Sequence, residues 1–260
     1  MEALLALPMW LVGIIFCFGG AALGVALVLL LRPFVKRNHG EEHNSVFSDA
    51  FAAVATLFAI VAGLLVFAVV GAFDTASSAS ANEAAALRQM YHNVQVFPAA
   101  EKAKAEQAIT AYTKSVIADE WPTMSHGEAS EKTAASLNSM FKVIGTMTPQ
   151  PSWSDQYTLV SGKMSDVVAL RVARIDSSQP ALSGLYLLLL FSSAGITMLI
   201  LALDYAENRL MHCIAVGLTG FVLASVLFLM VEVNSPYNGE ISVSPENFET
   251  TLQAFTEISK

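Results

Sequence analysis

Three groups of side chains in this sequence could carry chemistry, and the first surrounds a pair of histidines. His39 and His43 flank two glutamates in the run His-Gly-Glu-Glu-His, and imidazole and carboxylate groups are ligands of zinc. The run differs from the HExxH pattern of zinc enzymes, and Gly40 favours a loop over a helix. The alternative is that the glutamates complement the N-terminal dipole of a following helix. We therefore expect no metal site.

The second group is the carboxylate pair Asp119 and Glu120, which directly precedes Trp121 and Pro122. Two neighbouring carboxylates could serve acid–base catalysis. No nucleophile, phosphate-binding loop or second carboxylate cluster accompanies them, so we expect a solvated helix end with Trp121 packed at the proline break. The sequence predicts no catalytic residue and no cofactor, and we expect a protein that is not an enzyme.

The third group is the pair Arg171 and Arg174, which are three residues apart and therefore share one face of a helix. Two exposed guanidinium groups could attract anions toward the mouth of a pore. They could equally pair with Asp166 or Asp176, or meet lipid headgroups. The sequence leaves these alternatives open.

The segments that must position these residues have a composition typical of membrane-spanning helices. The chain has 260 residues, of which 54% are hydrophobic and 14% charged. Soluble domains carry about 25% charged residues, so this chain lacks the polar surface that water would require. Charged residues vanish from four windows of about 19 to 23 residues, enough to cross roughly 30 Å of hydrocarbon. The windows are 9–31, 51–73, 181–203 and 213–231.

We therefore expect an all-α membrane protein with four transmembrane helices and a helical soluble domain inserted between spans two and three. The spacing of Ala84, Leu87 and Tyr91 predicts that span two continues beyond the bilayer. No segment alternates with period two, so strands are not expected. The expected parts are the first span with a cytoplasmic loop (1–50), the second span (51–73), a helical extramembrane domain (74–180), the third and fourth spans (181–233) and an acidic C-terminal tail (234–260).

The charged residues argue against nucleic acid as a partner and predict how the chain is oriented in the membrane. With 14 basic and 22 acidic residues the net charge is −8, which argues against nucleic acid. Basic residues concentrate in two short loops, as Arg32, Lys36 and Arg37 after span one and as Arg209 after span three. Such loops face the cytoplasm. We expect an integral protein of the bacterial cytoplasmic (inner) membrane, with the central domain and both termini extracytoplasmic.

The windows themselves contain no Asp, Glu, Lys, Arg or His, which disfavours proton-coupled transporters and pumps. A channel stays possible, because pores can gate through apolar constrictions. Span two places four apolar residues along one helical stripe as candidates for lining a pore, the alternative being plain contact with lipid or another helix. These residues are Phe51, Val54, Phe58 and Leu65.

Small residues recur in the first and fourth spans. They are Gly19, Gly20 and Gly24 in the first, and Gly217 and Gly220 in the fourth. Because small residues let helix backbones approach closely in lipid, this pattern predicts tight packing. The packing could join helices of one chain or form an interface between copies.

Further landmarks recur in order along nearly the whole chain. They are His43-Asn44 before span two, Ala84 to Tyr91 (AAALRQMY), Glu120-Trp121-Pro122 followed by Met124, Arg171 and Arg174 before span three, and Pro236, Tyr237 and Gly239 in the segment after span four that continues to Phe248. Together they resemble the bestrophin-like family catalogued as domain of unknown function 4239. The chain departs from the family pattern at Ser45 and at Asn234-Ser235.

Bestrophins are oligomeric anion channels whose pore is lined by the second span, so the resemblance implies a homo-oligomeric channel with span two nearest the axis. It also implies a cytoplasmic central domain, whereas the basic residues of the loops predict that this domain lies outside. We base the expected orientation on the loop charges. The expected partners are membrane lipids, further copies of the chain and a larger membrane complex. The alternative function is a non-catalytic structural or accessory subunit that docks a partner through the central domain or the acidic tail.

Overall fold

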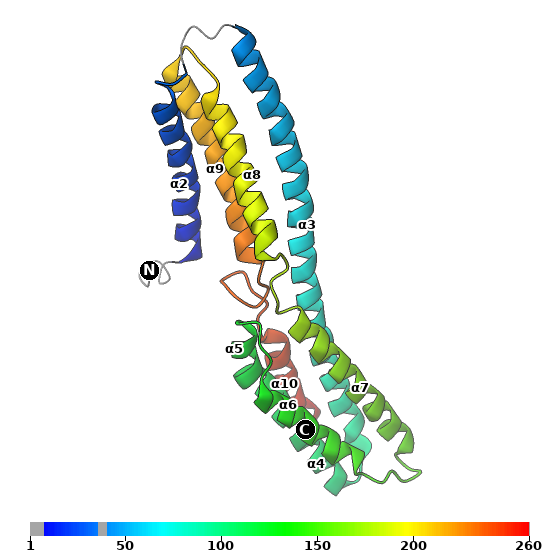
Figure 1. Ribbon diagram of the computed structural model, residues 1–260. Coiled ribbons are helices and arrows are strands. Elements are labelled where there is room, and N and C mark those ends of the chain that lie inside the picture. Colours follow the sequence, from blue (N-terminus) through cyan, green and yellow to red (C-terminus); the bar gives the residue numbers. More distant parts are fainter. Residues whose placement is uncertain (1–7, 36–40, 260) are drawn as a thin grey trace. The chain divides into compact units, whose positions relative to one another are not determined.

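The computed structural model describes residues 8–35 and 41–259, with side chains from residue 45 onward in the second range. All regular structure in these ranges is helical and none of it is strand, which confirms the expected all-α class (Figure 1). The elements are α2 (Met9–Leu31), α3 (Glu41–Asn93), the 3₁₀ turn η1 (Val94–Val96), α4 (Ala99–Ser115), the π-helical turn η2 (Val116–Glu120), α5 (Trp121–Met124), α6 (Glu131–Gly145), α7 (Ser154–Asp176), α8 (Gly184–Leu203), α9 (Arg209–Val233) and α10 (Glu246–Ile258).

Four helical stretches in the described ranges are long and apolar enough to cross a membrane. They are Met9–Leu31, Ser45–Val96, Gly184–Leu203 and Arg209–Val233. Each contains or closely matches one of the four predicted windows, so the chain is an integral membrane protein. The fourth helix begins earlier than predicted, because the side-chain oxygen of Asn208 accepts the N–H groups of Leu210 and Met211 at 3.1 and 3.2 Å. Such a cap satisfies the unpaired donors of a first helical turn.

Helix α3 is 53 residues long and extends well past residue 73, which confirms the predicted continuation of span two. Its sequence contains no proline, and the helix ends five residues before Pro98. Beyond Asp74 it is rich in alanine, the residue with the highest intrinsic helix propensity. The helix therefore persists where its apolar pattern gives way to a polar one.

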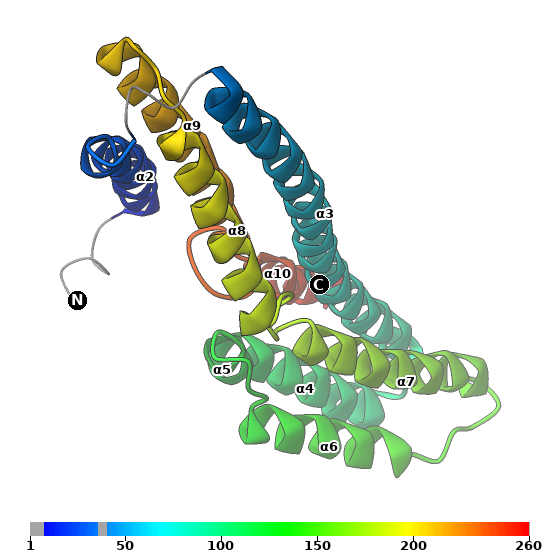
Figure 2. The ribbon, with the colours of Figure 1, turned by 45° about the horizontal axis from the view of Figure 1, so that its top comes forward.

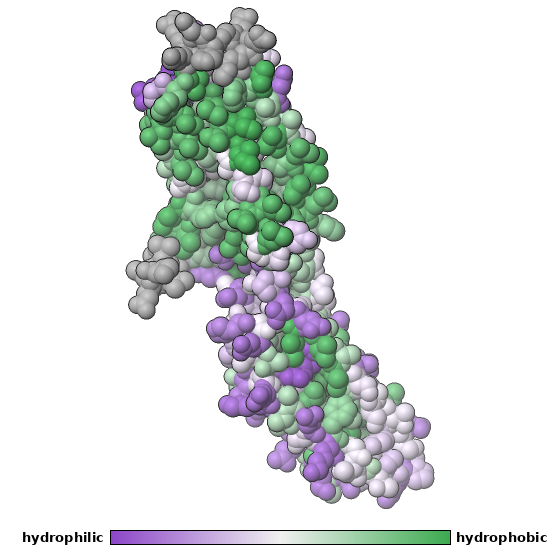
Figure 3. All heavy atoms as spheres, in the orientation of Figure 1, coloured by the Kyte–Doolittle hydropathy of each residue, from purple (hydrophilic) through white to green (hydrophobic). Residues whose placement is uncertain are grey.

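The chain divides into two compact units, each with its own core. The first unit holds the described residues up to Val70 together with Leu182–Asn234, and the second holds Gly71–Ala181 with the described residues from Ser235 onward. Figure 3 shows apolar side chains gathered over the helices of the first unit and polar side chains over those of the second. The segment after span four thus belongs to the same unit as the central helices.

In the first unit, α2 and α9 pack through glycine. A methyl group added at Gly20 would lie 2.6 Å from the carbonyl oxygen of Gly220, and one added at Gly24 would lie 2.8 Å from that of Val216. Only glycine permits these backbones to approach so closely. For Gly20, Gly24 and Gly220 the structure thus favours packing within one chain.

In the second unit, helices α4, α6 and α7 lie together around one apolar core (Figure 2). Helix α10 contributes Phe248 and Phe255 to this core, and the Phe255 ring stacks on that of Tyr91 with centroids 4.0 Å apart. The C-terminal helix is therefore anchored by buried aromatic side chains.

Candidate functional site

The stripe predicted to line a pore faces inward in the single chain. Phe58 is 8% exposed and lies in the apolar core of the first unit with Ala62 and Leu190. Leu65 packs against the edge of the same core, and Phe51 and Val54 are half-buried. The pore-lining role of these four residues stays a prediction.

A different stripe of α3 is exposed in the first unit. Leu57, Ile60, Leu64 and Phe67 follow one another at helical spacing and are 63, 55, 66 and 80% exposed. An apolar side chain is at no disadvantage facing lipid, so exposure alone does not demand a partner in a membrane. The stripe is nevertheless the face of α3 that its own chain leaves free for lipid, another copy or a pore.

The histidine group lies outside the structural description. His39 falls in the gap between the two described ranges, and the side chains of His43 and Asn44 are not described. Within the described part of the chain, no three His, Cys, Asp or Glu residues come together to hold a metal ion.

The most unusual feature of the second unit is a fully buried arginine. The Arg174 side chain has no solvent exposure, and its Nε donates to Glu83 Oε2 at 2.8 Å. Its Nη2 donates to Glu120 Oε2 at 2.7 Å and to Glu83 Oε1 at 3.3 Å. Burial acts to lower the pKa of Arg174, but the two carboxylates, Glu83 first, outweigh it and raise that pKa above its ordinary value. The guanidinium is therefore charged inside the protein.

Arg171 completes the cluster from one turn earlier on α7. Its side chain is 12% exposed, and its Nε donates to both carboxylate oxygens of Glu120 at 3.2 Å. Glu120 is fully buried and is shared by the two arginines. Two cations thus meet two anions, and no net charge is left in the interior.

A wider helical turn delivers Glu120 to this position. Residues Val116–Glu120 form the π-helical turn η2, which is followed at once by Trp121 and Pro122. Proline has no N–H to donate, and π turns insert an extra residue into a helix, often at functional sites. Glu120 lies in the core, while its neighbour Asp119 is at the surface and pairs with Lys132 at 3.2 Å.

Neutral and aromatic groups enclose the cluster. The Tyr112 hydroxyl donates to Glu83 Oε1 at 2.6 Å, and burial, reinforced by Glu83, raises the pKa of Tyr112 well above its ordinary value. The Arg174 guanidinium carbon lies 5.6 Å from the centre of the Trp121 ring and 5.4 Å from that of Phe248. Cation–π attraction is strongest where water is excluded, as it is here.

The segment after span four closes over the same region of the second unit. The Tyr237 hydroxyl donates to the carbonyl of Ala76 at 3.0 Å, and its ring meets Trp121 edge-on at 5.4 Å. Pro236 accepts a backbone hydrogen bond from Val243 at 2.8 Å, and Gly239 takes a φ of +90°, which strongly favours glycine. Burial raises the pKa of Tyr237 to about 12.

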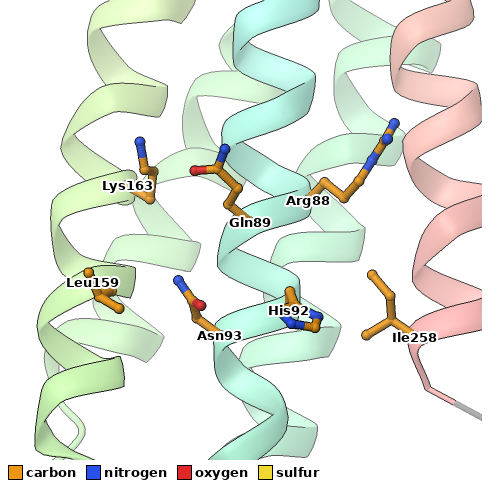
Figure 4. Close-up of a pocket in the computed structure, with 7 residues that line it drawn as sticks. All are labelled: Arg88, Gln89, His92, Asn93, Leu159, Lys163 and Ile258. Atoms are coloured by element: carbon orange, nitrogen blue, oxygen red, sulfur yellow. The ribbon is translucent and has the colours of Figure 1, made fainter.

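The second unit also carries a shallow groove of about 400 Å³, drawn in Figure 4. Its lining comprises Arg88, Gln89, His92 and Asn93 from α3, Leu159 and Lys163 from α7, and Ile258 from α10. Arg88 donates to the Thr251 hydroxyl at 3.2 Å, and Lys163 pairs with Asp166 at 2.8 Å. Unlike Arg174, the cations of this groove are accessible from solvent.

The model of a family described as "Bestrophin-like domain" matches residues 18–248. The chain belongs to the Bestrophin-like family. No curated protein matches it.

The solved structures agree on the fold of this bestrophin-like chain. Three variants of a bacterial bestrophin homologue from Klebsiella pneumoniae align with TM-scores of 0.75, 0.76 and 0.75 at 13, 13 and 16% identity. The alignments cover 94, 94 and 96% of this chain and 98, 98 and 97% of those chains. At such identities the likeness establishes the fold alone.

One expectation about the charged residues of this bestrophin-like protein needs correction, and the ion-pair partners that the sequence left open can be named. Glu120 is not part of a solvated helix end, because the π turn carries it into the core. The carboxylates beside Arg171 and Arg174 are Glu83 and Glu120 rather than residues of α7 itself, and Asp166 pairs with Lys163 instead. The anion-attracting role of the two arginines stays a prediction.

Sequence reasoning missed Glu83 and Tyr112, although one signal was present. Val160, Met164 and Val167 form the buried stripe of α7, and Arg171 and Arg174 continue it at the same spacing. Glu83 likewise precedes Leu87 by four residues on the buried face of α3. Opposite charges that interrupt two apolar stripes indicate helices that meet through an ion pair.

Replacing Arg174 with methionine should destabilise the second unit by about 3–5 kcal/mol, because two buried carboxylates would keep one cation between them. The measurement is the free energy of unfolding of the detergent-solubilised chain in denaturant. Lys132→Met is the matched control, since Lys132 is 81% exposed and such pairs contribute about 0–1 kcal/mol. Equal losses in the two variants would contradict a special role for the buried cluster.

Tyr237 predicts a loss of stability at alkaline pH. A tyrosine of the unfolded chain titrates near pH ~10, whereas Tyr237 of the folded chain keeps its proton until about 12. Between these values the unfolded state binds fewer protons, so the free energy of unfolding falls as pH rises, by up to about 1.4 kcal/mol per unit. Tyr237→Phe should make that fall less steep in denaturant titrations. Identical slopes would mean that the burial of this hydroxyl does not perturb its titration.

Proposed function

We propose that this chain is one subunit of a homo-oligomeric, anion-conducting channel in which α3 lies nearest the pore axis. Membership of the Bestrophin-like family supports the proposal, because bestrophins are oligomeric anion channels with a pore lined by the second span. The observation that carries it is the apolar stripe of Leu57, Ile60, Leu64 and Phe67, which the chain leaves exposed on its second span. Several copies that turned this stripe toward a common axis would form an apolar constriction of the kind that gates by dewetting.

The second unit exposes polar side chains of its own. Its portion of α3 exposes Asn82, Gln89 and His92, whose side chains include hydrogen-bond donors. Of these, Gln89 and His92 line the groove of Figure 4 together with Arg88 and Lys163. Because Arg171 and Arg174 are paired with buried carboxylates, we assign the attraction of anions to exposed Arg88 instead, which donates to the neutral Thr251 hydroxyl.

The decisive experiment is ion flux through purified protein in sealed liposomes, with chloride and potassium gradients tested separately. We expect protein-dependent chloride flux that exceeds potassium flux. Leu64→Ala should raise the chloride flux several-fold, because a smaller side chain widens and wets the constriction. Leu188→Ala on α8 is the matched control, since Leu188 is 64% and Leu64 66% exposed in the same unit.

Other outcomes would redirect the proposal. If Phe58→Ala changed the chloride flux and Leu64→Ala did not, the pore would instead be lined by the stripe of Phe51, Val54, Phe58 and Leu65. Equal effects of Leu64→Ala and Leu188→Ala would indicate a general response to lipid contact. No flux through a well-folded oligomer would favour a non-catalytic accessory subunit of a membrane complex.

We further propose that the second unit is a soluble domain inserted between spans two and three, and that it lies outside the bacterial cytoplasmic membrane with both termini. The basic residues of the two short loops support this orientation. A cysteine at exposed Ala103 on α4 should react with a membrane-impermeant maleimide in intact cells, whereas one at exposed Glu207, between α8 and α9, should react only after permeabilisation. The reverse pattern would place the second unit in the cytoplasm.

A further inference from the structure

The exposed stripe of Leu57, Ile60, Leu64 and Phe67 continues along α3. Further exposed residues follow at alternating steps of four and three. They are Gly71, Asp74, Ser78, Ala81, Ala85, Arg88 and His92. Because seven residues fall only about 20° short of two full turns, these residues form one stripe that winds slowly around the helix.

Asp74 is the first charged residue of this stripe after its apolar part. The sequence of α3 contains no Asp, Glu, Lys, Arg or His from Ala50 to Phe73. Asp74 is exposed, and its side chain enters no ion pair or hydrogen bond within the described residues. Its negative charge therefore acts on the surroundings of α3 without compensation from its own chain.

Distance along the helix decides which charge acts on the apolar part of the stripe. Asp74 follows Phe67 by seven residues, or roughly 10 Å of helical rise. This is close to the Debye length of about 8 Å at physiological ionic strength. Arg88 lies roughly 21 Å beyond Asp74, so its charge is largely screened there. The charge that acts at this end of the apolar stripe is thus negative.

We propose that Asp74 sets the charge selectivity of the pore, by repelling chloride and attracting potassium at one end of the apolar constriction. The inference rests on the proposed function, in which several copies turn the stripe of α3 toward a common axis. Each copy then contributes one carboxylate to a ring, and rings of Asp or Glu favour cations. Low-dielectric walls focus the field of such a ring on the path of the ion. Asp74 therefore lowers the ratio of chloride to potassium flux.

The test compares chloride and potassium flux in sealed liposomes for the native chain and three variants. Asp74→Asn removes the charge at nearly constant shape and should raise the chloride-to-potassium flux ratio several-fold. Asp74→Glu keeps the charge and should keep the native ratio. Asp176→Asn is the matched control, because Asp176 is also exposed but ends α7 and lies off α3. This control should leave the ratio unchanged.

Ionic strength separates an electrostatic role of Asp74 from a structural one. Raising the salt concentration from about 0.1 M to about 1 M shortens the Debye length from about 10 Å to about 3 Å. The flux ratios of the native chain and of Asp74→Asn should therefore converge at high salt.

The outcomes distinguish this inference from the proposed function. Chloride flux with a native ratio in Asp74→Asn, or with an equal rise in Asp74→Glu or Asp176→Asn, would overturn the role of Asp74 and leave anion conduction in place. Potassium flux above chloride flux in the native chain, with a shift toward chloride in Asp74→Asn alone, would contradict anion conduction and support the role of Asp74.

Discussion

The second unit depends on the compensation of one buried charge. Arg174 cannot lie without exposure in a protein core unless its guanidinium is paired and hydrogen-bonded, and Glu83 and Glu120 provide both. These partners come from α3 and from the π turn after α4, so the requirement fixes how α7 faces both. Trp121, Phe248 and Tyr112 then pack around groups whose positions are already set. Separating α7 from either partner would leave a buried charge uncompensated, which is strongly unfavourable.

Helix α3 is continuous from a part suited to hydrocarbon to a part suited to water. Its early residues expose an apolar stripe suited to hydrocarbon, and its later residues expose amides and a histidine suited to water. The absence of proline and the abundance of alanine keep one hydrogen-bonded helix throughout. The same helix thus supplies a membrane span to the first unit and buried side chains to the core of the second.

Glycine occurs in two settings in the spans. Gly20, Gly24 and Gly220 let the backbones of α2 and α9 touch, which replaces the hydrophobic driving force that lipid cannot supply. Gly19 and Gly195 differ, because a methyl group added at either would find no atom within 4 Å. Close helix packing therefore accounts for Gly20, Gly24 and Gly220 but not for Gly19 and Gly195.

The sequence by itself determined the all-helical class, the four spans, the continuation of span two and the family. Each of these follows from local pattern: hydropathy over a bilayer's length, helical spacing around Leu87 and Tyr91, and landmarks in a fixed order. Only the tertiary structure decided that Phe58 faces its own chain, that Leu64 is exposed and that Arg174 meets Glu83, 91 residues away. An apolar stripe has the same helical period whether it faces its own chain or the surroundings. The sequence near an arginine does not indicate which distant carboxylate will pair with it. Tertiary packing determines which way the stripe of α3 faces and which carboxylates Arg174 meets.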